Sequence, residues 1–104
     1  MIVSIYSTMV IATPPSMYGG LEQIAYLLCK YLDETNITVN LFATNESYKP
    51  KNGMLFSTGP AGKVNPDDAI KGFWNDERSR KALMESDICI DFSWNYYLYA
   101  FHDN

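Results

Sequence analysis

The 104-residue sequence lacks the signatures of several classes of protein. Neither of two common phosphate-binding patterns, G-x-G-x-x-G and G-x-x-x-x-G-K-[ST], occurs in it. One histidine and two distant cysteines, Cys29 and Cys89, provide no set of ligands at the spacing of a metal site. No apolar run reaches the ~18 residues that a membrane span requires. The sequence therefore predicts no metal, no cofactor and no transmembrane segment.

Basic residues are also few, since 8 Lys and Arg stand against 12 Asp and Glu and give a net charge of −4. These charges are scattered, so no basic face is available for a nucleic-acid backbone, and we expect no nucleic-acid partner. Met1 leads into an apolar segment without a basic region or a cleavage site. We expect a cytoplasmic protein, and peripheral contact with a membrane stays open. Both cysteines lie in apolar runs and are predicted to be reduced residues of the core.

What is present is an alternation of strand and helix patterns within one domain, residues 1–104, in which 47% of the residues are apolar. Runs rich in β-branched residues predict that segments 3–7, 38–43 and 88–92 are adjacent parallel strands, with the first in the middle. Helices are expected from Leu21 and over 76–86, the second with Asn75 as its cap. A short strand is expected at 54–57 and an irregular segment at 58–68. The pattern predicts an α/β, Rossmann-like three-layer αβα fold with a mainly parallel sheet.

Two glycines stand where the first helix should begin. Little side-chain bulk covers the backbone at Gly19 and Gly20, and unpaired N–H groups at a helix start attract a phosphate. The alternative is a tight turn that needs positive φ. Asp91 and Ser93 stand at the carboxyl end of another predicted strand, so both pairs should lie at the edge of the sheet where such folds bind ligands. Asp91 and Ser93 could equally be the solvated end of a strand.

The segments PPSMYGGLE, residues 14–22, and VNLFATNES, residues 39–47, resemble the amino-terminal domain of family 4 glycosyltransferases of the GT-B type. The resemblance covers residues 1–47 and continues more weakly over 79–99. It implies transfer, with retention of configuration, from a nucleotide-sugar donor to a sugar or lipid-linked acceptor, without an obligatory metal. The chain would be the incomplete, acceptor-side half of such an enzyme, with no second domain. Gly19 and Gly20 would lie near the donor phosphates, and Glu22 would match the family's acidic residue.

Relatives often carry a His-x-His pair where this chain has Ile90, Asp91 and Phe92, so no role of those histidines is carried over. Asp91 and Ser93 remain candidates to hydrogen-bond a sugar, and no catalytic residue is assigned. We expect the chain alone to be inactive and to self-associate through its aromatic segment 96–101. His102 is expected to be exposed. The alternative function is a stand-alone Rossmann-like binding or assembly module without catalysis.

Overall fold

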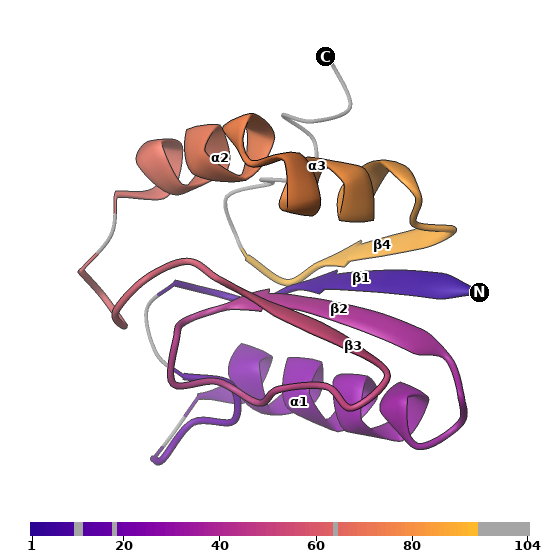
Figure 1. Cartoon of the computed structure of the whole chain (residues 1–104). Coiled ribbons are helices and arrows are strands. Elements are labelled where there is room, and N and C mark those ends of the chain that lie inside the picture. Colours follow the sequence, from indigo (N-terminus) through magenta and orange to yellow (C-terminus); the bar gives the residue numbers. More distant parts are fainter. Residues whose placement is uncertain (10–11, 18, 64, 94–104) are drawn as a thin grey trace.

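A four-stranded sheet lies between one helix on one face and two helices on the other (Figure 1). The computed structural model describes residues 1–9, 12–17, 19–63 and 65–93. The strand order is β3-β2-β1-β4, and all neighbours are parallel. The elements are β1 (Ile2–Tyr6), α1 (Gly20–Asp33), β2 (Thr38–Ala43), β3 (Gly53–Ser57), α2 (Pro66–Asn75), α3 (Glu77–Met84) and β4 (Ile88–Asp91).

Strand β1 is the centre of this arrangement and pairs with β2 on one side and β4 on the other. Ile5 lies opposite Leu41 in β2 and Ile90 in β4. The prediction that these three segments are adjacent and parallel, with the first in the middle, is therefore confirmed. So is the predicted Rossmann-like αβα fold, since a parallel sheet buries both of its faces under helices.

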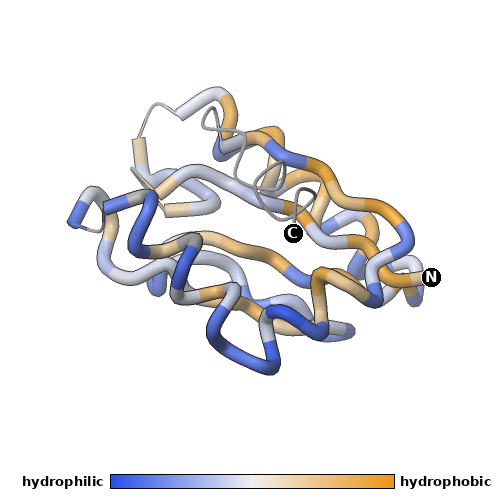
Figure 2. Tube along the Cα trace, turned by 90° about the horizontal axis from the view of Figure 1, so that it is seen from above, coloured by the Kyte–Doolittle hydropathy of each residue, from blue (hydrophilic) through white to orange (hydrophobic). Residues whose placement is uncertain are grey.

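Each face of the sheet has a core of its own. Beneath α1, alternate strand residues such as Ile5 and Leu41 pack with Cys29. On the other face, the ring of Phe42 stacks on that of Phe56 with centroids 4.8 Å apart, and Phe73 of α2 meets Phe42 edge-on. Coloured by hydropathy, the trace is largely hydrophobic in the strands and hydrophilic in many of the connecting turns (Figure 2).

Helix α2 begins inside the segment predicted to be irregular, and that prediction was wrong for residues 66–68. Asn65 caps this helix, because its side-chain oxygen accepts a hydrogen bond from the N–H of Asp67 at 2.8 Å. The predicted cap of the next helix was also wrong. Asp76, not Asn75, accepts from the N–H of Ser79 at 3.0 Å and caps α3.

The two cysteines have different surroundings. Cys29 is fully buried, and its burial, together with the negative charge of Asp33, raises the pKa of the thiol to about 12. Cys89 is exposed, which corrects the prediction of a core position: β4 is one of the two edge strands of the described sheet, so its side chains are less covered than those of the central β1. Neither forms a disulfide. The predictions for segment 96–101 and for His102 lie outside the described residues.

Candidate functional site

The candidate site lies at the edge of the sheet where the parallel strands end. The chain passes from β1 to β2 on one side and returns to β4 on the other side, so the order of the strands reverses at β1. In open α/β sheets, ligands bind outside the carboxyl ends of the strands at such a reversal. Helix α1 starts at this edge (Figure 1) and brings Gly19, Gly20 and Glu22 to it. Asp91 ends β4 at the same edge.

Gly19 is the cap residue of α1 and has φ −174° and ψ 88°. This is extended backbone, so the glycine is not there to supply positive φ. Its carbonyl accepts the hydrogen bond from Gln23 N at 2.9 Å, which starts the helix. No side chain of the described residues caps this first turn. The N–H groups of the turn therefore keep the partial positive charge of a helix start.

Glu22 in the first turn of α1 is only 6% exposed. The hydroxyl of Thr8, two residues past the end of β1, donates a hydrogen bond to its carboxylate. This contact holds the start of the helix against the end of the central strand. The sequence analysis did not identify Thr8. The sequence feature that could have indicated it is a hydroxyl residue just beyond the end of a buried strand.

Asp91 and Ser93 are hydrogen-bonded to each other. The N–H of Ser93 donates to Asp91 Oδ1 at 2.7 Å, and the hydroxyl of Ser93 donates to the same oxygen. Asp91 pairs with Tyr6, the last residue of β1, and Phe92 N donates to the Tyr6 carbonyl at 2.8 Å. Asp91 therefore lies beside Tyr6, and Glu22 is bonded to Thr8 two residues further along, so each of them contacts the segment at the end of β1.

Buried hydroxyl groups fasten the loop between β1 and α1, and the sequence analysis did not identify them. The hydroxyls of Ser7 and Thr13 are 2.6 Å apart, and Thr13 N donates to Ser47 Oγ at 2.9 Å. Ser47 Oγ also lies 3.0 Å from Thr44 Oγ1, and Tyr48 N donates to the Thr13 carbonyl at 2.7 Å. The loop that presents the glycine pair is thereby tied to the end of β2.

This arrangement can attract an anion to the helix start and can form hydrogen bonds with hydroxyl groups through its carboxylates. Over the described ranges, no group of three or more His, Cys, Asp or Glu side chains could hold a metal ion. Comparison with protein families, with curated proteins and with solved structures finds no match to this chain. In the part of the chain that the structure describes, no helix has the length and apolar character needed to cross a bilayer.

Proposed function

We propose that the chain is the amino-terminal, acceptor-side domain of a retaining GT-B glycosyltransferase. The observation that carries this proposal is the position of the glycine pair. Gly19 and Gly20 form the uncapped start of α1, at the reversal of strand order beside β1. The motif that resembles the family thus coincides with the place where this fold class binds ligands.

In the proposed reaction, the N–H groups at the start of α1 stabilise negative charge on the donor phosphates as the sugar leaves. Glu22, held by Thr8, fixes the orientation of the first turn. Asp91 and Ser93 contribute hydrogen bonds to a sugar hydroxyl of the donor or the acceptor. A second domain would supply the rest of the donor site and close the cleft.

The decisive experiment replaces Gly20 with Val in the full-length enzyme and measures nucleotide-sugar binding by calorimetry. A β-branched side chain at the helix start would hinder approach of a phosphate, so we expect the Kd to rise by about tenfold or more. Gly72→Val is the matched control, since Gly72 lies inside α2, on the opposite face of the sheet from α1. Equal affinities in the two variants would overturn the proposed phosphate site.

The 104-residue chain by itself is expected to transfer no sugar, because one helix start provides too little charge stabilisation and positioning for the reaction. Incubation with a panel of nucleotide sugars and acceptors tests this. Turnover that survives repurification would contradict the assignment of half of the site to another domain.

The alternative function is a stand-alone binding or assembly module. It would be favoured by an encoding reading frame that stops at Asn104, together with no nucleotide-sugar binding.

A further inference from the structure

We propose that β3 pairs edge to edge with β3 of a second copy of this chain, antiparallel and about a two-fold axis at Leu55. This inference is independent of the proposed enzymatic function. Among the described residues, β3 pairs only with β2. Thr58 N donates to the Ala43 carbonyl and Asn52 O accepts from Val39 N, so the even-numbered residues of this segment bond inward. By the alternation of a parallel ladder, Leu55 and Ser57 turn their N–H and C=O groups outward.

Within the described residues, the strand itself carries none of the usual protection against pairing, and the one charged side chain with a hydrogen bond to it is Arg78 of α3, which donates to Met54 Sδ at 3.1 Å. Natural edge strands carry charged residues, prolines or bulges that prevent association, or they are covered by another element. The strand Gly53–Ser57 contains no charged residue and no proline. Helices α2 and α3 lie over one face of the sheet, and no helix or strand of the described residues covers its β3 edge (Figure 1). An uncharged, regular edge strand is a template for another strand.

Antiparallel pairing about Leu55 brings complementary groups together. Leu55 exchanges both of its outward hydrogen bonds with Leu55 of the second copy, and Gly53 does the same with Ser57 of the second copy. The interface is isologous, so it closes at two copies and does not propagate into a filament. Parallel pairing would not give this closed symmetry.

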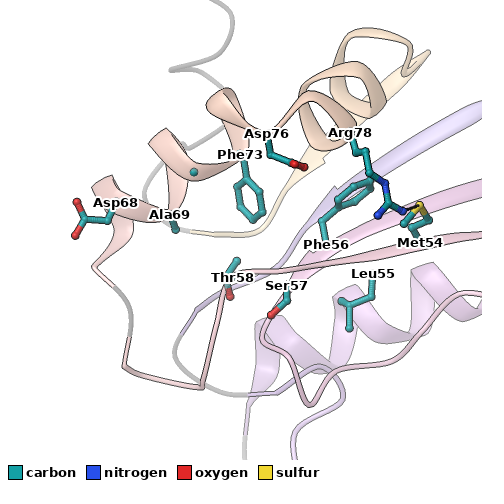
Figure 3. A pocket seen from close by; sticks show the side chains of 11 residues that line it. Met54, Leu55, Phe56, Ser57, Thr58, Asp68, Ala69, Phe73, Asp76 and Arg78 are labelled. Carbon is teal, nitrogen blue, oxygen red and sulfur yellow. Dashed lines mark hydrogen bonds between the residues drawn. The ribbon is translucent and has the colours of Figure 1, made fainter.

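The charges along the edge favour the same orientation. Arg78 and Lys81 lie by Met54 at the amino end of β3, together with Glu85, and Asp76 borders the adjoining hollow with Arg78. Asp68 lies beyond the other end of the strand, and its carboxylate points outward (Figure 3). Antiparallel pairing turns Arg78 and Lys81 of each copy toward Asp68 of the other.

A hollow of about 470 Å³ lies between β3 and α2, and it offers room for a side chain of the second copy. Phe56 and Phe73 border it, whereas Leu55 points to the opposite face of the sheet (Figure 3). A Cβ atom at Gly72 would meet no atom within 4 Å, so the hollow is open there. In the proposed register, Met54 of the second copy stands beside Phe56. Its flexible thioether chain is suited to such an irregular space.

The test is sedimentation velocity of the whole chain over a range of concentrations, with Ser57→Pro compared with Ser57→Ala. Proline removes an N–H that points away from β2, so it removes hydrogen bonds to the second copy and none of the ladder to β2. We expect a dimer for the native chain and for Ser57→Ala, and a dimer Kd raised by about tenfold or more for Ser57→Pro. A monomeric native chain, or equal Kd values for the two variants, would overturn the proposal.

Charge reversal checks the orientation. Arg78→Asp should weaken the dimer, and adding Asp68→Arg to the same chain should restore it, because the complementary ends are then exchanged. If the double variant dimerised no more tightly than Arg78→Asp alone, the antiparallel arrangement would be contradicted.

A further variant, with Tyr96, Tyr97 and Tyr99 replaced by Ser, tests whether the aromatic segment forms the interface instead of β3. We expect the dimer to persist, and its loss would assign the interface to that segment.

Discussion

The two faces of the sheet differ in how completely their buried polar groups are hydrogen-bonded. On the α1 side, the loop hydroxyls bond to one another and Asp33 accepts three hydrogen bonds, from Tyr48 Oη, Lys51 N and Asn52 N at 2.6–2.8 Å. On the α2 side, the buried hydroxyl of Ser79 donates to the Phe73 carbonyl, but the buried hydroxyl of Thr58 has no partner among the described residues, and a hollow remains at Gly72. The α1 side thus fastens Thr13 to the segment after β2, while the α2 side leaves a hollow beside β3.

Among the substitutions that test this difference between the faces, Asp33→Asn should have the largest effect on stability. One N–H donor would then face an amide NH₂ group, and the free energy of unfolding should fall by about 2–3 kcal/mol at pH 7. Urea denaturation measures this. Glu34→Gln is the matched control, because Glu34 is exposed, and it should change stability by less than about 0.5 kcal/mol. Similar losses in both variants would contradict the role given to the Asp33 hydrogen bonds.

The effect of Asp33→Asn should also depend on pH. Burial opposes ionisation of Asp33, but the hydrogen bonds from Tyr48, Lys51 and Asn52 outweigh it and lower its pKa. A lowered folded-state pKa contributes stability that is complete above the unfolded value of about 4 and is lost as the pH falls through the folded value. The difference between native chain and variant should therefore shrink between pH 5 and about pH 2. A difference that is constant over this range would refute the linkage.

The next largest effect on stability is expected in the hydroxyl network of Ser7, Thr13, Thr44 and Ser47. Ser47→Ala removes the acceptor of Thr13 N, a buried group, and should lower the free energy of unfolding by about 2 kcal/mol. The matched control is Ser57→Ala, at an exposed hydroxyl. Amide hydrogen exchange at residue 13 should accelerate only in Ser47→Ala. Unchanged protection there would show that the loop is held by other contacts.

A pair of isosteric substitutions compares the two faces directly. Thr44→Val removes a bonded hydroxyl on the α1 side and should cost about 1 kcal/mol. Thr58→Val removes an unpartnered buried hydroxyl and should stabilise the fold by up to about 1 kcal/mol. Thermal unfolding of both variants gives the signs. Destabilisation by Thr58→Val would mean that its hydroxyl is bonded in solution.

The sequence predicted the sheet well because its physical signal is local. Runs rich in apolar and β-branched residues, such as 2–6, are typical of a strand buried on both faces. Apolar and polar residues alternate over 37–41, and Phe42 breaks this alternation because it belongs to the second core. The carboxylates of Asp33 and Glu34 oppose the dipole at the end of α1, which predicts that packing must hold that end. The end of α1 is held by hydrogen bonds between Asp33 and the turn at 48–52. These are tertiary contacts, so no local sequence pattern predicts them.

Helix α2 was missed for a different reason. Glycines and prolines at 59, 60, 62 and 66 favour an irregular segment, yet Asn65 followed by Pro66 is also a helix-start signal. At the candidate site, the sequence indicated the glycine pair and Glu22 but not Thr8. That contact joins residues 14 positions apart across the sheet edge, and no periodicity encodes it. Whether the predicted residues bind a nucleotide sugar stays a prediction.

The smallest expected effect is at Gly72, which lies inside α2 and borders the hollow. Glycine in a helix interior is less stable than alanine by roughly 0.5–1 kcal/mol, and here a Cβ atom would meet nothing within 4 Å. Gly72→Ala should therefore stabilise the chain by about that amount in thermal unfolding. Gly53→Ala is the contrasting control, because a Cβ atom at Gly53 would lie 1.7 Å from the Val39 carbonyl oxygen, so it should destabilise the β2–β3 pairing. If Gly72→Ala also destabilised the chain, the hollow would be filled in solution, and the contrast between the two faces would fail.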